Sequence, residues 1–287
     1  MEKENMDKLI KKVACINDIS CLGGASLTEI IPVLSSMGIR TLPVPTVVLS
    51  THSGGYDNYT YHNLTDHMVN QKKHWKDLGL HFDSIFSGFL GSVEQIKIVE
   101  DYMDTFSDES CLILVDPVMG DHGEIYSSID EKIVSEMKNL VKRAHIVTPN
   151  LTEAFLLVGE DYDPSPSKDK LIDLCKKISA MGPKDVIITS AIEDNSHISN
   201  AVYTSDKFSL VQGAKVGYTF PGTGDIFAST LLGLLLNGHT LLDSVNIASD
   251  FIYDLIDFSK DKDYSHRSGV LLEARLHKLY KYNKYNH

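Results

Sequence analysis

Short apolar runs rich in β-branched residues alternate along this chain with longer segments of helical periodicity. This alternation restricts the fold more than any other feature, because strands separated by helices pair in parallel and carry the helices on both faces of the sheet. We expect strands at residues 13–16, 46–49, 84–87, 111–115, 145–147 and 186–188, then a hairpin at 201–204 and 208–212. We expect helices at residues 25–37, 64–78, 130–141, 151–158, 168–181, 225–236 and 242–258, with others from residue 92 and after residue 268. The predicted fold class is therefore α/β, with a mostly parallel central sheet and helices on both faces.

Length and composition are typical of one globular domain. The 287 residues suffice for one large core, and no long linker divides them. The formal net charge of −12 argues against a general nucleic-acid or anionic-membrane surface. The longest apolar run, residues 226–236, is too short for a bilayer, and residues 1–12 lack the apolar segment of a signal peptide. The four cysteines show no C-x-x-C spacing. We expect a single domain over residues 1–287, located in the cytoplasm.

A glycine-framed motif, Gly222-Thr223-Gly224-Asp225, stands directly before the longest apolar run. Glycines let backbone N–H groups approach a ligand closely, and a helix N-terminus adds free N–H groups and partial positive charge. The motif therefore predicts a phosphate site, in which Asp225 would orient a hydroxyl beside a phosphoryl group. The alternative is a plain turn with Asp225 as helix cap. A Walker A loop is excluded because no Gly-Lys-Ser/Thr follows, and a dinucleotide fingerprint because Phe227 replaces its third glycine.

Polar and special residues follow the predicted strands at the points where the strands end. Ligands of parallel sheets bind beyond the carboxyl ends of the strands, so these residues should meet the glycine motif. They are Asn17-Asp18, His52-Ser53-Gly54-Gly55, Gly88-Phe89, Asp116, Thr148-Pro149-Asn150 and Thr189-Ser190. The last pair offers hydroxyls to a phosphate, with a strand-end turn as the alternative.

Two segments offer carboxylates for a metal ion. Asp116 and Asp121 lie on either side of a turn that contains proline and glycine, and Mg²⁺ prefers such oxygen ligands. An ordinary Asp-Pro turn is the alternative for Asp116. Asn150 and Glu153 add an acceptor and a carboxylate at the next strand end. Here the alternative is a helix start, in which the two side chains form a capping box.

Taken in order, these motifs resemble those of the ribokinase superfamily, and within it the pyridoxal (vitamin B6) kinase branch. They are Asp116-Pro-Val-Met-Gly-Asp121, Thr148-Pro-Asn-x-x-Glu153, Thr189-Ser190 and Gly222-Thr-Gly-Asp225, and the match covers residues 12–270. Sugar kinases of the superfamily usually have Gly-Ala-Gly-Asp at the last motif, and the related hydroxymethylpyrimidine kinases usually carry Cys in place of Asp225. The resemblance implies an ATP-dependent kinase that phosphorylates the 5′-hydroxymethyl group of pyridoxal, pyridoxine or pyridoxamine.

The resemblance also implies a role for each candidate residue. Asp225 would be the catalytic base, beside an anion hole made by Gly222, Thr223 and Gly224. The nucleotide would contact Asp116, Asn150, Glu153, Thr189, Ser190 and Phe220. Mg²⁺ would be held, partly through water, by Asp116, Asp121 and Glu153, with residues 121–128 as a mobile loop over the ATP. The acceptor pocket would be lined by Asp18, His52, Ser53, Phe89 and Asp225, and the ring of Phe89 can stack on a pyridine.

One position departs from the family pattern, since Asp18 stands where vitamin B6 kinases often carry a serine that contacts the pyridine. The preference among the three vitamers therefore stays open, and so does hydroxymethylpyrimidine as acceptor. A further alternative is a catalytically inactive sensor of pyridoxal or nucleotide, and ordinary loop polarity is the alternative for His52 and Tyr56. The resemblance also implies ATP as co-substrate, Mg²⁺ and K⁺ as candidate cofactors, and a homodimer without nucleic-acid or membrane partners.

Overall fold

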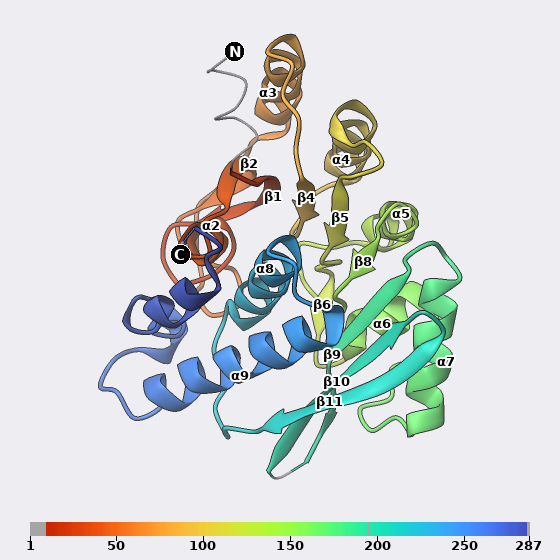
Figure 1. The fold of residues 1–287 in the computed structure, drawn as a ribbon, viewed down its shortest axis with the longest axis vertical. Coiled ribbons are helices and arrows are strands. Elements are labelled where there is room, and N and C mark those ends of the chain that lie inside the picture. Colours follow the sequence, from red (N-terminus) through yellow and green to blue (C-terminus); the bar gives the residue numbers. More distant parts are fainter. Residues whose placement is uncertain (1–9, 195, 286–287) are drawn as a thin grey trace.

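The computed structural model describes residues 10–194 and 196–285, which fold around a nine-stranded sheet (Figure 1). The strand order is β11-β10-β9-β8-β5-β4-β1-β2-β3. The strands are β1 (Lys12–Ser20), β2 (Arg40–Leu49), β3 (Tyr61–Asn63), β4 (Ser84–Ser87), β5 (Leu112–Val115), β8 (Ile146–Val147), β9 (Asp185–Glu193), β10 (His197–Thr204) and β11 (Lys207–Ala214). Neighbours from β2 to β9 pair in parallel, whereas β3, β10 and β11 extend the edges in antiparallel pairs. The predicted fold class is confirmed.

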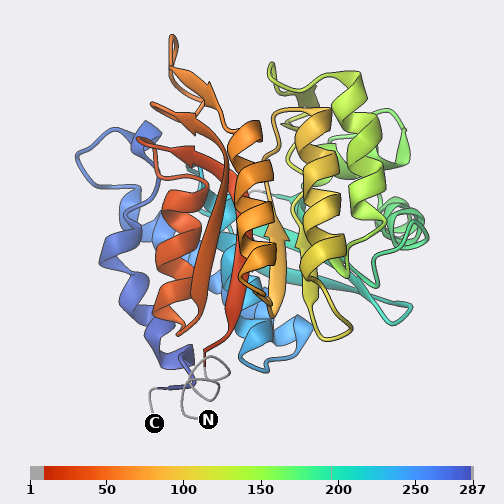
Figure 2. The same cartoon turned by 90° about the horizontal axis from the view of Figure 1, so that it is seen from above.

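Helices cover both faces of this sheet, and the strands are buried on both sides. In β1, Ala14 and Ile16 join one hydrophobic core while Val13 and Cys15 join the other, because successive side chains of a strand point to opposite faces. The first core is covered by α3 (Thr65–Asp77), α4 (Val93–Phe106), α5 (Glu131–Val141), α6 (Leu151–Val158) and α7 (Lys168–Ser179). The second is covered by α2 (Leu27–Ser36), α8 (Thr223–Leu236) and α9 (Leu241–Ser259). Figure 2 shows α3, α4 and α5 side by side.

β2 is longer than the sequence pattern predicts, because its first half contains two prolines that the sheet tolerates. β2 begins at Arg40 rather than at residue 46 and includes Pro43 and Pro45. Up to residue 45 it pairs with β1 alone, and β3 joins its other side only at residues 47–49. A proline is tolerated there because its missing N–H faces no second strand.

The prediction of an α-helix after residue 268 is wrong. This segment forms the 3-10 turns η2 (Leu272–Ala274) and η3 (Leu276–Tyr282), and a further turn, η1 (His266–Ser268), comes directly before it. Leu272 and Leu279 are buried in the second core, so contacts with distant elements decide the backbone here rather than helical periodicity. Within the described ranges, no helix combines the length and the apolar character needed to cross a membrane.

Candidate active site

The polar residues predicted from the sequence gather at one edge of the sheet, although Asn17 and Asp18 lie within β1, which continues to Ser20 instead of ending at residue 16. Asn17, at a bulge in β1, donates its side-chain N–H to Asp225 and accepts the backbone N–H of Phe89, which follows β4. Asn150, which follows β8, forms a bridge with Thr189 in β9. β-Bulges often occur beside functional sites, because they redirect a side chain. The site therefore lies beyond the carboxyl ends of the strands, as the sheet topology requires.

Gly222 forms the tight turn that opens α8. It is the N-cap of this helix in the left-handed conformation, with φ +76°, and a Cβ here would lie 1.9 Å from the carbonyl oxygen of Gly24. The first N–H groups of a helix have no partner within it, and no side chain caps α8. Gly224, in contrast, has open space where its Cβ would stand. The helix therefore presents free N–H groups and partial positive charge to the site, as an anion hole requires.

The carboxylate of Asp225 is held by two donors from the start of the chain. Its Oδ1 accepts the side-chain N–H of Asn17 at 3.0 Å, and its Oδ2 accepts the backbone N–H of Ser26 at 2.9 Å. Asp225 lies in the first turn of α8 and does not cap it, so the capping alternative is wrong. Burial and the charge of Asp18 raise the pKa of Asp225 to about 6, so the group is ionised at neutral pH and can still accept a proton.

Asn17 and Ser26 are the residues whose roles the sequence did not reveal. Ser26 has a positive φ of 62°, a conformation that costs a non-glycine residue free energy and that occurs preferentially at functional sites. Its hydroxyl donates to Asp18 Oδ1 at 2.5 Å, while Ser20 donates to Asp18 Oδ2 at 2.8 Å. The buried Asp18 thus supports Ser26, which in turn orients Asp225. No local pattern marks these serines, although Asn17 follows the first predicted strand.

Asp116 and Glu153 are both buried, and Asp116 lies close enough to Asp225 on one side and to Glu153 on the other for their charges to interact. Burial raises the pKa of Asp116, and the neighbouring charge of Asp225 raises it further. Burial likewise raises the pKa of Glu153, together with the charge of Asp116. Several carboxylates with little compensating charge disfavour one another's ionised forms. This arrangement suits a cation that would neutralise them.

The first turn of α6 connects these carboxylates to the segment after β5. Asn150 and Glu153 form the capping box named above as the alternative for this pair, so that alternative is confirmed. The same two side chains also reach outward. Glu153 Oε1 accepts the backbone N–H of Met119 at 3.0 Å, and Asn150 Nδ2 donates to the carbonyl oxygen of Gly120 at 2.8 Å. Both residues therefore stabilise the start of α6 and the segment after β5, besides any contact with nucleotide or metal.

The segment expected to be a loop over the nucleotide begins as a β-hairpin of β6 (Gly120–Asp121) and β7 (Glu124–Ile125). Its turn residues His122 and Gly123 have φ values of +50° and +82°, typical of a type I′ turn. The carboxylate of Asp121 is half-exposed. Tyr126 follows directly. Its side chain is 39% exposed, and the burial of the remainder together with the charge of Glu153 raises the pKa of its phenol. Tyr126 is thus a further polar group at the carboxylates that the sequence did not single out.

Thr189 and Ser190 lie within β9, which continues to Glu193 instead of ending before them. Ser190 adopts φ +51°, and its backbone N–H donates to Asn200 Oδ1. The pairing with β10 shifts register at this point. This irregularity interrupts the strand where both hydroxyls lie, at the same edge of the sheet as the motif of α8.

On the acceptor side, His52 is buried and both of its ring nitrogens contact the backbone. Nδ1 accepts the N–H of Gly54, so Nε2 carries the proton and donates to the carbonyl oxygen of Arg267 at 2.9 Å. The ring of Tyr56 meets it edge to face at 5.2 Å. Ser53 is exposed and Phe89 is half-buried. His52 therefore anchors the loop after β2 to the C-terminal part of the chain.

Phe220, a predicted nucleotide contact, lies in a cluster of aromatic rings. Its side chain is buried and packs on the rings of Tyr264 and His266, with centroid distances of 6.5 and 4.7 Å. Tyr218 packs on His266 at 5.6 Å and is 46% exposed. Tyr218 is therefore the aromatic side chain of this cluster most open to a planar ligand.

Among the described residues, no three His, Cys, Asp or Glu side chains are arranged so that they could hold a metal ion by themselves. Mg²⁺ commonly keeps several waters and binds through one or two carboxylates together with substrate phosphates. The buried Asp116 and Glu153 and the half-exposed Asp121 fit that mode of binding.

Comparison with known proteins agrees with this geometry. The model of the phosphomethylpyrimidine kinase family matches residues 21–270. A putative phosphomethylpyrimidine kinase from Bacteroides thetaiotaomicron is 38% identical, covers 94% of both chains and superposes with a TM-score of 0.92. Pyridoxal kinase from Lactobacillus plantarum is 28% identical, covers 97% of this chain and 99% of its own, and has a TM-score of 0.88. Pyridoxal kinase of Dictyostelium discoideum is 27% identical over 92% of this chain and 93% of its own.

These similarities confirm the resemblance to the vitamin B6 kinase branch. The chain belongs to the phosphomethylpyrimidine kinase family within the ribokinase-like fold, and it is a phosphotransferase with an alcohol group as acceptor.

Proposed function

We propose that this enzyme transfers the γ-phosphoryl group of ATP to the 5′-hydroxymethyl group of pyridoxal, pyridoxine or pyridoxamine, in vitamin B6 salvage. The observation that carries the proposal is the position of Asp225. Asn17 joins this carboxylate directly to Phe89 on the acceptor side, while the free N–H groups of α8 lie beside it on the phosphate side. A base that aligns an alcohol next to an anion hole is what phosphoryl transfer to a hydroxymethyl group needs.

Pyridoxal as acceptor is supported by a close relative. A second crystal form of the Bacteroides thetaiotaomicron protein, 38% identical with a TM-score of 0.91, was determined with pyridoxal. Hydroxymethylpyrimidine is the second candidate, because the family description names a pyrimidine and a hydroxymethylpyrimidine/phosphomethylpyrimidine kinase of Bacillus subtilis is 23% identical. ADP release with each of the three vitamers and with hydroxymethylpyrimidine separates the two. We expect the highest kcat/KM with a vitamin B6 vitamer, and turnover of hydroxymethylpyrimidine alone would overturn the proposal.

We further propose Mg²⁺ as the cofactor, with Asp116, Asp121 and Glu153 near it and K⁺ as an additional activator. Mg²⁺ bound to ATP would lower the charge repulsion between the phosphates and the buried carboxylates. The anion hole of residues 222–224, with Asn150, Thr189 and Ser190, would contact the phosphates. Asp18, His52, Ser53 and Phe89 would shape the acceptor pocket. A single-domain homodimer in the cytoplasm completes the proposal, and light scattering of the purified protein tests the dimer.

Replacing Asp121 with Ala should raise the Mg²⁺ concentration needed for half-maximal rate, and excess Mg²⁺ should partly restore activity. Asp121 is suited to this test because its carboxylate is half-exposed. Among the described residues it accepts the backbone N–H of the adjacent His122, whose ring nitrogen lies 3.6 Å from its other oxygen. Initial rates at fixed ATP and varied Mg²⁺ measure the effect. Glu124→Ala, which removes another exposed charge of the same hairpin, is the matched control. An unchanged Mg²⁺ dependence in Asp121→Ala would remove Asp121 from the metal site.

Glu153→Gln tests the deeper carboxylate in the same way. Glu153 also receives hydrogen bonds from the backbone N–H groups of Asn150 and Met119, so alanine would remove structural contacts along with the charge. Glutamine keeps the size of the side chain and one acceptor oxygen. We expect a higher Mg²⁺ requirement with a modest loss of thermal stability. A normal Mg²⁺ requirement would leave Glu153 with its structural contacts alone, the capping box and the bond to Met119.

A further inference from the structure

The β6–β7 hairpin carries Asp121 and Tyr126 to the buried carboxylates, yet it has little structure of its own. Each strand has two residues, and residues 121–127 are exposed. An isolated two-stranded hairpin is marginally stable even when it is longer. Contacts with other elements must therefore set its position.

The first turn of α6 supplies contacts along the whole hairpin. Glu153 and Asn150 hold its base through Met119 and Gly120, as described above. Its turn is held by Thr152, whose Oγ1 accepts the backbone N–H of Gly123 at 2.9 Å. Thr152 is buried, and Asn150 rather than Thr152 caps the helix. The Thr152 hydroxyl thus has no capping role and points to the hairpin turn.

The connection from α6 to α7 supplies a second contact at the same glycine. A Cβ at Gly123 would lie 2.6 Å from Cδ1 and 2.9 Å from Cε1 of Tyr162, so the ring lies directly against the turn. The ring of Tyr162 in turn meets that of Phe155, a core residue of α6, edge to face at 5.9 Å. Gly123 therefore fits between the Thr152 hydroxyl and the Tyr162 ring only because it has no side chain.

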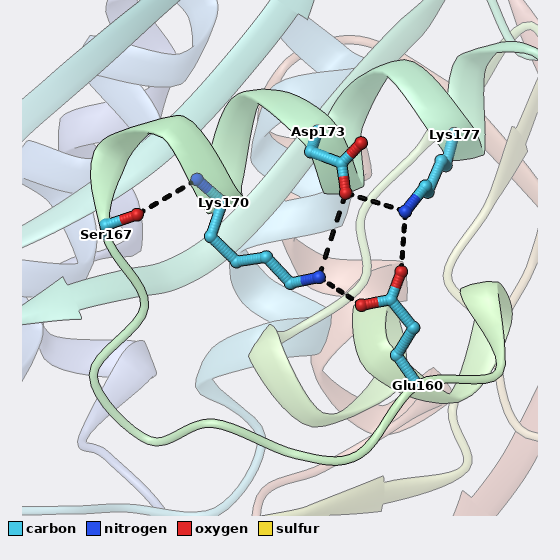
Figure 3. A network of polar contacts seen from close by, with 5 residues as sticks. All are labelled: Glu160, Ser167, Lys170, Asp173 and Lys177. Carbon is cyan, nitrogen blue, oxygen red and sulfur yellow. Dashed lines mark hydrogen bonds and ion pairs between the residues drawn. The ribbon is translucent and has the colours of Figure 1, made fainter.

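Polar contacts tie both ends of this connection to α7 (Figure 3). At its start, Glu160 accepts hydrogen bonds from Lys170 and, at 2.7 Å, from Lys177, which also pairs with Asp173. At its end, Ser167 caps α7 by accepting the backbone N–H of Lys170. Because both ends are fixed on one helix, Tyr162 between them has a defined position.

We infer that Thr152 and Tyr162 form a seat for the turn of the β6–β7 hairpin and are positioning residues for the nucleotide side of the reaction. They act through the hairpin, which presents Asp121 and Tyr126 to the metal-bound phosphates. The inference rests on the proposed use of MgATP, because only then does the position of the hairpin affect turnover. Among the described residues, the contacts of Thr152 and Tyr162 are with the hairpin and α6 and not with Asp18, His52 or Phe89. Replacing either residue should therefore weaken MgATP binding and leave the affinity for the vitamin unchanged.

The first test compares Thr152→Val with Thr152→Ser. Valine keeps the shape of the side chain and removes the acceptor, which leaves the N–H of Gly123 unpaired against a methyl group, whereas serine keeps the acceptor. We expect Thr152→Val to raise the KM for MgATP by about 3- to 30-fold. The KM for pyridoxal should not change, and Thr152→Ser should resemble the wild type. A KM for MgATP that is normal in Thr152→Val, or equally raised in Thr152→Ser, would overturn the role of the hydroxyl.

The second test is a double-mutant cycle between Gly123→Ala and Tyr162→Ala. The single change at Gly123 forces a methyl group into the Tyr162 ring and strains a backbone with positive φ. Removing the ring eliminates the overlap, so the double variant should bind MgATP better than the effects of the single variants predict. Tyr253→Ala, which removes a partly exposed tyrosine from α9, is the control and should bind normally. Additive effects in the cycle would show that the ring is no seat for the turn.

Two readouts work without any acceptor and keep this inference separate from the proposed function. One is the affinity for MgADP by calorimetry, and the other is hydrogen exchange of the backbone amides at residues 119–128. Thr152→Val should weaken MgADP binding and speed exchange in this segment even if pyridoxal is not the substrate. Normal MgADP affinity and normal exchange in Thr152→Val, with full pyridoxal turnover in the wild type, would defeat the inference and leave the proposed function intact.

Discussion

Asp225→Asn is expected to reduce kcat for phosphorylation of pyridoxal by about 10²- to 10⁴-fold, the usual contribution of a general base. Phosphoryl transfer to an alcohol passes through a loose transition state, so the carboxylate aligns the hydroxyl and accepts its proton late in the step. Asparagine keeps the size of the side chain and one acceptor oxygen for Asn17 or Ser26, but it removes the charge and the basicity. The affinity for ATP should hold or improve slightly, because a negative charge beside the γ-phosphate is lost. Steady-state kinetics with varied ATP and pyridoxal measure both constants.

The pH dependence of the wild-type enzyme provides the matching evidence. The pKa of Asp225 is raised to about 6, so kcat/KM should fall as the pH drops below about 6 and the carboxylate becomes protonated. The residual activity of Asp225→Asn should lack this acidic limb. A folded Asp225→Asn protein with near-normal kcat would remove the catalytic role, and an unchanged acidic limb would assign that pKa to another group.

Gly222→Ala is expected to have the second large effect. Its Cβ would stand 1.9 Å from the carbonyl oxygen of Gly24, and its φ of +76° disfavours any side chain. Both conflicts involve backbone, so the turn that directs the N–H groups of α8 must shift. Losing one such donor typically costs about 10²- to 10³-fold in rate. We expect a loss of kcat/KM in that range together with a lower melting temperature, measured by kinetics and thermal unfolding.

Gly224→Ala is the matched control for this crowding. Gly224 has no positive φ, and its Cβ would meet no atom within 4 Å. The variant should unfold at the wild-type temperature, and any loss of activity would come from a methyl group that meets the bound phosphate. A Gly222→Ala protein with normal stability and activity would contradict the tight turn described here.

The succession of strands and helices along the chain could be predicted from the sequence, because each element has its own local periodicity. Buried runs such as the one at residues 112–115 read as strands, and their ends placed Asp116 and Asn150 at one edge of the sheet. The β6–β7 hairpin could not be predicted in this way, because strands of two residues show no periodicity. The 3-10 turns after residue 268 depend on contacts with distant helices, which no window of sequence contains.

The candidate site could be predicted from the sequence only in part, because some of its contacts join residues far apart in the chain. The glycine motif and the carboxylates are local patterns, and each was found. The donors that orient Asp225 are not local, since Asn17 and Ser26 are separated from it by 208 and 199 positions. Ser26 in particular depends on a strained backbone conformation that composition does not reveal. The roles of Thr152 and Tyr162 likewise follow only from the position of Gly123.

The identity of the phosphorylated product tests most directly whether this enzyme is a vitamin B6 kinase. The purified enzyme is incubated with MgATP and an equimolar mixture of pyridoxal and hydroxymethylpyrimidine, and the phosphorylated products are identified by mass spectrometry and ³¹P NMR. From the proposed function we expect pyridoxal 5′-phosphate as the main product, formed in equal amount with ADP and nearly absent with Asp225→Asn. Phosphorylated hydroxymethylpyrimidine without pyridoxal 5′-phosphate, or no phosphorylated product at all, would contradict it.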